Sequence, residues 1–133
     1  MNGEMDLEKL LASLQPKLLD ENFVFCSTLD MPIESVMALM PVATYREQGG
    51  MSLILTESAA RSAGFEVSAL FRCITLTVHS SLDAVGLTAA VADKLASNNI
   101  SANMVAAYYH DHVYVPAAKA EQALELLSEF QKS

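Results

Sequence analysis

The sequence predicts an α+β protein in which helices cover one face of antiparallel sheets. Across the 133 residues, the pattern strand, helix, strand pair and helix occurs twice. Apolar and polar residues alternate strictly from Phe71 to His79, which is typical of a half-buried strand. Apolar residues recur at helical spacing after Pro116, which is typical of an amphipathic helix. We therefore divide the chain into two units, residues 1–70 and residues 71–133.

The first unit is expected to begin with an extra helix. Leucines recur at helical spacing over residues 4–19, and Pro16 is expected to end or kink that helix. Gly64 suits a position after a helix, where a positive φ is needed. The remaining elements expected in this unit are strands at 23–29, 42–47, 51–55 and 66–70 and helices at 33–40 and 57–63.

In the second unit, the strand at 71–79 has two distinct faces. Ile74, Leu76 and Val78 lie on the apolar face, which we expect to meet the helices. The opposite face carries Cys73, Thr75, Thr77 and His79. The elements expected after this strand are helices at 84–96 and from 116 onward, a left-handed stop at Asn98–Asn99, and strands at 103–109 and 112–115 joined through His110–Asp111.

Two short echoes indicate an internal duplication. The segment Cys26–Asp30 resembles His79–Asp83, and the segment Val42–Tyr45 resembles Val105–Tyr108, in the same order along the chain. Each unit then reads as strand, helix, hairpin and helix. Two helices on one face of a small antiparallel sheet form the split β-α-β, ferredoxin-like plan.

The residues around Gly86 resemble the strand-to-helix turn of ACT domains. Asp83 is followed after two residues by Gly86 and then by the aliphatic Leu87, although Val85 stands where those domains usually have proline. The segments 23–26, 42–47, 74–79 and 107–116 are similar to small bacterial tandem ACT proteins of unassigned function. The resemblance implies tandem βαββαβ units, an amino acid or another small effector as ligand, and dimerisation.

The candidate ligand site is the turn that leads into the helix at 84–96. Gly86 permits close approach of a ligand, and free N–H groups at the helix start can receive a carboxylate. Asp83 is a candidate either to hold an amino group or to cap the helix, so a purely structural turn is the alternative. The candidate ligand-binding residues are His79, Ser80, Ser81, Leu82, Asp83, Val85, Gly86 and His112.

The residues at this turn suggest two other kinds of chemistry. His79 and His112 are expected to be neighbours on adjacent strands, and with Asp83 or Asp111 they offer a zinc-like ligand set. We rank this metal site below hydrogen-bonded polar residues, and we expect no cofactor. Ser80 and Ser81 beside His79 do not form a nucleophile–base pair, since no carboxylate orients the imidazole. We therefore expect no enzymatic activity.

Composition limits the remaining function classes. A formal charge of −8, with eight scattered basic residues, argues against nucleic-acid binding. No apolar run approaches a membrane span and no signal pattern opens the chain, so we expect a cytoplasmic protein. Cys26 and Cys73 are expected to be reduced and buried. The sequence thus predicts a regulatory module that binds an amino acid and forms a homodimer, with a structural dimerisation module as the alternative.

Overall fold

The computed structural model describes residues 7–78 and 86–132. It divides into two compact units, which we call the large unit (Met1–Asp20 with Arg72–Ser133) and the small unit (Glu21–Phe71). Strand β1 (Gln15–Thr28) is 14 residues long and contributes its first residues to the large unit and the rest to the small unit. The division between residues 70 and 71 is based on the repeated sequence pattern and stays a prediction. In space, the first twenty residues group with the second half of the chain.

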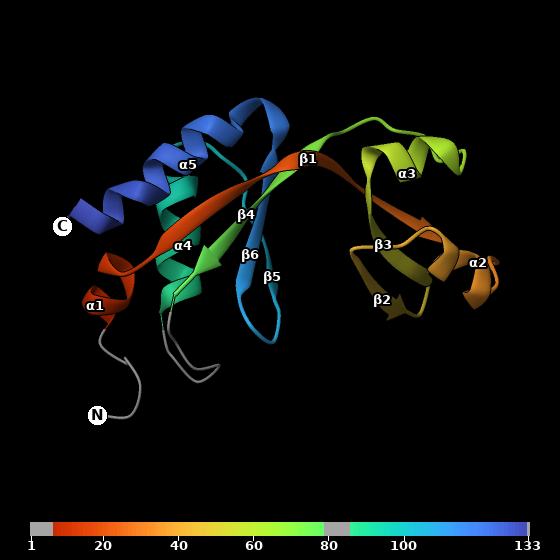
Figure 1. Cartoon of the computed structure of the whole chain (residues 1–133), viewed down its shortest axis with the longest axis horizontal. Helices are drawn as coiled ribbons and strands as arrows, with labels where there is room; N and C mark the ends of the chain where they lie inside the picture. Colours follow the sequence, from red (N-terminus) through yellow and green to blue (C-terminus); the bar gives the residue numbers. More distant parts are fainter. Residues whose placement is uncertain (1–6, 79–85, 133) are drawn as a thin grey trace. The chain divides into compact units, whose positions relative to one another are not determined.

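The large unit contains a sheet with strand order β1-β4-β6-β5 (Figure 1). This is the ferredoxin-like order, with its fourth strand supplied by the beginning of the chain. Strands β5 and β6 are antiparallel, and Met104 pairs with Val113. The other elements are α1 (Leu7–Ala12), β4 (Phe71–Thr77), α4 (Leu87–Ala96), β5 (Asn103–Ala106), β6 (Asp111–Pro116), η1 (Ala117–Lys119), α5 (Ala120–Ser128) and η2 (Glu129–Lys132).

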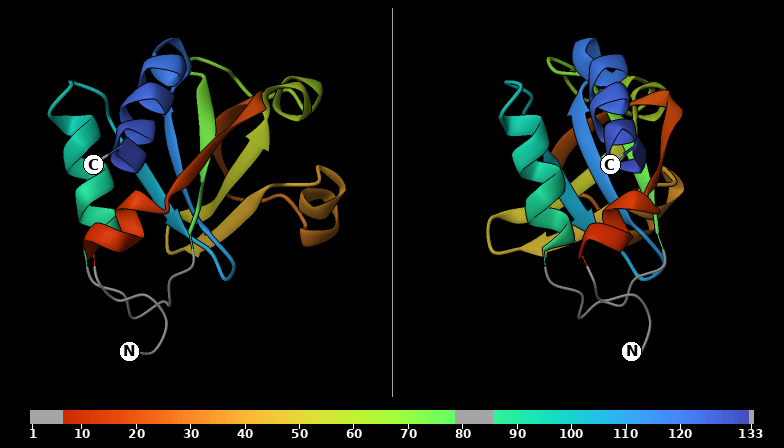
Figure 2. Two further views of the ribbon diagram at one scale, coloured as in Figure 1. Left: turned by 60° about the vertical axis from the view of Figure 1, so that its left-hand side comes forward. Right: turned by 90° about the vertical axis from the view of Figure 1, so that its left-hand side faces the viewer.

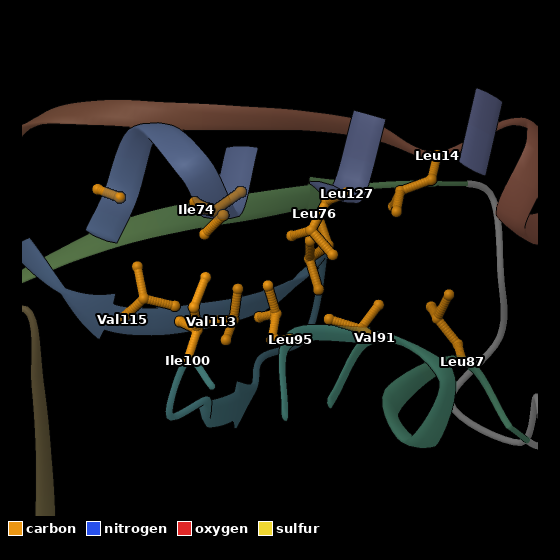
Figure 3. Packing of buried hydrophobic residues seen from close by; sticks show 12 residues of the cluster. Leu14, Ile74, Leu76, Leu87, Val91, Leu95, Ile100, Val113, Val115 and Leu127 are labelled. Carbon is orange, nitrogen blue, oxygen red and sulfur yellow. The ribbon is translucent and has the colours of Figure 1, made fainter. Parts of the chain in front are cut away.

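The core of the large unit lies between the sheet and helices α4 and α5 (Figure 3). The alternation in β4 is confirmed, since Ile74 and Leu76 are buried in this core and Val78 packs against it. Each fully buried aliphatic side chain of this kind contributes roughly 1.5–3 kcal/mol. The buried members are Leu14, Ile74, Leu76, Leu87, Val91, Leu95, Ile100, Val113, Val115, Ala120, Ala123 and Leu127.

The small unit repeats the plan with shorter helices. Its strand order is β2-β3-β1, and both pairings are antiparallel. Val24, Leu53 and Leu55 point from the sheet toward Val36 and Ala60 of the two helices, forming a small core. The elements are α2 (Ile33–Ala38), β2 (Ala43–Glu47), β3 (Gly50–Thr56) and α3 (Glu57–Ser62).

Two expected elements are wrong. The helix expected over residues 4–19 ends at Ala12, and strand β1 begins at Gln15. Leu14 and Leu18 fit the apolar stripe of a helix, but together with Pro16 they also fit the alternation of a strand. Pairing of β1 within the sheet favours the strand over the helix in this segment. Residues 66–70 form no strand. By contrast, Gly64 and Asn99 have the positive φ values, 85° and 61°, that their sequence context predicts.

None of the helices in residues 7–78 and 86–132 is long and apolar enough to cross a membrane.

Candidate functional site

Three elements of the large unit gather at one of its ends, where the candidate turn was expected. The end of β4, the start of α4 and helix α1 lie together there (Figure 2). Of the predicted site residues, the structure describes Gly86 and His112. His79, Ser80, Ser81, Leu82, Asp83 and Val85 lie outside the described residues.

Gly86 occupies a backbone conformation that favours glycine. Its φ is 101°, and it forms the left-handed N-cap of α4, where its carbonyl accepts a hydrogen bond from the N–H of Ala90 at 2.9 Å. A Cβ at this position would lie 3.1 Å from Cδ2 of Leu7 in α1. Gly86 has no side chain with which to cap the helix, and the first turn of α4 carries no acidic residue. The first N–H groups of α4 therefore offer positive potential to an anionic group.

His112 lies on the polar side of the sheet and is held by its neighbour on β4. Its Nδ1 is 3.1 Å from the hydroxyl oxygen of Thr75, and the Thr75 side chain is half-buried. Burial lowers the pKa of His112, the nearby His110 lowers it further, and Asp111 opposes the shift. The imidazole is therefore held toward its neutral form, which accepts and donates one hydrogen bond each.

Cys73 and Tyr114 form the next pair along the same two strands. Burial raises the pKa of the Tyr114 hydroxyl and of the Cys73 thiol, and the tyrosine O–H donates a hydrogen bond to the sulfur. Moving from Cys73 to Thr75 along β4 corresponds to moving from Tyr114 back to His112 along β6. This is the register of two antiparallel strands. Cys73 is 1% exposed and Tyr114 is 3% exposed, so this part of the face is not solvated. Both cysteines are free thiols; Cys73 is buried as expected, whereas Cys26 is only half-buried, so the expected burial of Cys26 is wrong.

The hairpin tip differs from its expected position. Tyr108 and Tyr109 form the tip and are 81% and 83% exposed, while the N–H of Ala107 bonds to the carbonyl of His110. The strand expected over residues 103–109 ends at Ala106, and the expected connection through His110–Asp111 is wrong for Asp111, which already belongs to β6. The Nδ1 atom of His110 is buried and has no hydrogen-bond partner among the described residues.

A cavity of about 400 Å³ lies next to the end of β4. Such a volume is within the range of small-molecule sites. The polar groups of its described lining residues are hydroxyls and amides, and none of these described side chains is charged. The side-chain amide of Gln131 also donates to the carbonyl of Leu14 at 2.5 Å, which leaves the Gln131 Oε1 atom as an acceptor. The lining residues are Ala12, Ser13, Gln15, Thr77, Val78 and Gln131.

Most of this lining was not predicted from the sequence. Ser13 comes from the turn between α1 and β1, Gln15 is the first residue of β1, and Gln131 comes from η2 near the end of the chain. No local pattern relates these segments to β4, because only the sheet order brings β1 beside β4. Thr77 was identified, but only as part of the polar face.

A second hollow of similar size, about 420 Å³, lies at the opposite end of α4 and is more open. Lys119 donates from its ammonium group to the carbonyl of Asn99 at 2.7 Å beside it. Its lining residues are Ala96, Asn99, Ile100, Ser101, Pro116 and Lys119.

The expected neighbour of His112 in a metal site, His79, lies outside the described residues. Within residues 7–78 and 86–132, no three His, Cys, Asp or Glu side chains gather as metal ligands would.

Solved structures with a similar fold include three that cover most of this chain. A Vibrio cholerae protein of unknown function, described as a possible transport protein, is 51% identical, with a TM-score of 0.87 over 94% of this chain and 95% of that one. An Agrobacterium tumefaciens protein is 18% identical, with a TM-score of 0.72 over 89% of each chain. The regulatory subunit of aspartate kinase from Thermus flavus is 12% identical, with a TM-score of 0.60 over 89% of this chain and 96% of that one.

No protein of curated function matches the sequence. Two ACT-domain families match it in tandem, one over residues 2–72 and the other over residues 69–129. The expected fold of tandem ACT-like units is thereby confirmed. Because the first match alone spans more than half of the 133 residues, the chain belongs to the ACT-domain family, whose members are regulatory ligand-binding modules.

Proposed function

We propose that this protein is a regulatory module that binds a free amino acid in the cavity beside the end of β4. The cavity itself is the observation that carries the proposal, since its volume of about 400 Å³ accommodates an amino acid with room for bound water. The family supports a bound ligand, and the cavity lies at the end of β4, the strand that precedes the turn predicted from the sequence to bind it.

The polar groups of the cavity suit a neutral amino acid. The Thr77 hydroxyl donates or accepts, and Oε1 of Gln131 can accept from an ammonium group. The Ser13 hydroxyl can only accept, because it already donates to the carbonyl of Leu10 at 2.9 Å. Among the residues that the structure describes, no charged side chain lines the cavity, so a charged ligand side chain would lose hydration without gaining an ion partner from them. We therefore expect neutral amino acids to bind more tightly than aspartate, glutamate, lysine or arginine.

The test is a thermal-shift measurement with all twenty free amino acids on the intact protein. A ligand at a hundred times its Kd stabilises the folded state by about 2.7 kcal/mol, which is easily detected as a rise in Tm. Ala12 is exposed and lines the cavity, so Ala12→Trp should remove the shift without unfolding the protein. Ser101→Trp is the matched control, because Ser101 is exposed and lines the second hollow. Twenty amino acids without an effect would contradict the proposal.

A homodimer is part of the proposal. In the large unit, β5 is the edge of the sheet, and its outer N–H and C=O groups are available to a strand of a second copy. Light scattering at micromolar concentration should give twice the mass of 14.4 kDa. A monomer at that concentration would count against the dimer and leave the ligand site standing.

A further inference from the structure

Helix α2 of the small unit presents apolar side chains to solvent. Leu29, Ile33, Met37 and Met40 are 76%, 54%, 55% and 82% exposed, and we call these four residues the α2 surface. Ile33 and Met37 are one helical turn apart and so lie on the same side of α2. Val36 is the only residue that this helix buries. Single exposed apolar residues are ordinary, but a cluster within twelve residues is typical of an interaction site.

The backbone holds the α2 surface in a fixed form. Pro32 is the N-cap of the helix and Pro41 follows its end, so proline limits the backbone on both sides. Met40 has a φ of 52°, although left-handed backbone is costly for a large side chain. Its N–H bonds to the carbonyl of Met37 at 3.0 Å, which keeps this strained turn closed. Met40, which is highly exposed, is therefore held in place by a constrained turn.

Charge decides what kind of partner fits. No lysine or arginine occurs between Lys17 and Arg46, whereas the exposed carboxylates Asp30 and Glu34 lie among the residues of the α2 surface. A second copy packed face to face would bring like carboxylates together, and an anionic lipid surface or a nucleic acid would be repelled. A positively charged partner gains attraction at the same position.

We propose that the α2 surface docks a basic amphipathic segment of another protein. The apolar face of that segment packs on Met37 and Met40, whose flexible side chains adapt to varied partners. Its lysines or arginines pair with Asp30 and Glu34. This surface belongs to the small unit, and all residues that line the proposed effector cavity belong to the large unit. The docking surface therefore stands or falls independently of the effector.

The probe is a fluorescein-labelled, 18-residue helical peptide built of leucine and lysine with one apolar face. Fluorescence anisotropy measures its Kd for the intact protein, and a peptide with glutamate in place of every lysine serves as comparison. The lysine peptide should bind about tenfold or more tightly than the glutamate peptide, with an affinity that falls as salt is added. Absence of binding by the lysine peptide overturns the proposal.

Two pairs of substitutions locate the peptide. Met37→Ser with Met40→Ser should weaken binding of the lysine peptide about tenfold or more, since it removes the apolar contact without changing the charge. Tyr108→Ser with Tyr109→Ser is the matched control at exposed apolar residues of the hairpin tip, and it should change the Kd less than about twofold. Equal weakening by both pairs would mean only general attraction to an acidic chain, and it overturns the proposal.

Charge reversal provides a readout that needs no apolar substitution. Asp30→Lys with Glu34→Lys, both at exposed positions, should make the glutamate peptide the tighter ligand. An unchanged preference for the lysine peptide overturns the proposal. Light scattering tests the other occupant: if Met37→Ser with Met40→Ser converts a dimer into monomers, the α2 surface is covered by a second copy and the proposal is wrong.

Discussion

The hydroxyl of Thr75 lies 3.1 Å from Nδ1 of His112 and joins strands β4 and β6 on the polar side of the large unit's sheet. This hydrogen bond fixes the orientation of the one predicted site histidine that the structure describes. It also places His112 in register with the pair of Cys73 and Tyr114. The polar side of the sheet thus carries the cross-strand pairs Thr75 with His112 and Cys73 with Tyr114. Each pair leads to a prediction about stability or reactivity.

The lowered pKa of His112 predicts that the protein loses stability as the pH falls below 6.5. Burial lowers its pKa in the folded protein below the ordinary 6.5, so the unfolded chain binds a proton first as pH falls. The contribution of His112 is therefore fully present above pH 6.5 and decreases as pH falls from there toward the lower folded-state pKa. Thermal unfolding at several pH values should show a smaller acid loss for His112→Gln than for the unchanged protein. An identical loss in both would contradict this role of His112.

Removal of the Thr75 hydroxyl should cost stability. Thr75→Val keeps the shape of the side chain and leaves Nδ1 of His112 without its partner, which should lower the free energy of unfolding by about 1 kcal/mol. Urea unfolding measures the change. Thr44→Val, at an exposed position of β2, is the control and should cost less than about 0.5 kcal/mol. Equal effects would show that the hydrogen bond is not stabilising.

Gly86 and Gly64 form a matched pair that separates backbone strain from contact. Both have positive φ, 101° and 85°, so alanine should cost about 1–2 kcal/mol at either position through strain alone. Only at Gly86 would a Cβ crowd another side chain, Leu7 at 3.1 Å. Gly86→Ala should therefore be the more destabilising, and adding Leu7→Ala should remove the excess.

The two thiols should differ in reactivity. Cys73 is 1% exposed and accepts a hydrogen bond from Tyr114, whereas Cys26 is half-buried. Burial raises the pKa of both thiols, and the thiolate is the reactive form. In folded protein, the single thiol of Cys26→Ser should react with a maleimide on the order of tenfold more slowly than that of Cys73→Ser. Mass spectrometry follows the reaction, and comparable rates would mean that Cys73 is accessible.

The sequence was most informative about which side chains of a strand point toward the helices. Alternation in β4 predicts correctly that Ile74 and Leu76 enter the core, because a strand position leaves a side chain only two directions. Positive φ at Gly64 and Asn99 was also predictable, since those residues tolerate it after a helix.

The cavity was not predictable in the same way. Its lining comes from Ser13, Thr77 and Gln131, which are distant along the chain and meet only because β1 joins the sheet of the large unit. The helix expected over residues 4–19 hid this strand, since leucine spacing alone does not distinguish a short helix followed by a strand from one long helix. Long-range strand pairing, which no local pattern encodes, thus creates the candidate site.

The central claim is that an amino acid occupies the cavity beside the end of β4. Chemical-shift mapping by NMR tests it most directly, with a neutral amino acid titrated into the isotopically labelled protein. The account predicts that the amide signals of Ser13, Thr77 and Val78 move together and saturate, and that Ala12→Trp abolishes the movement. Movement confined to Asn99 and Ser101 at the second hollow, or no movement with any amino acid, would contradict it.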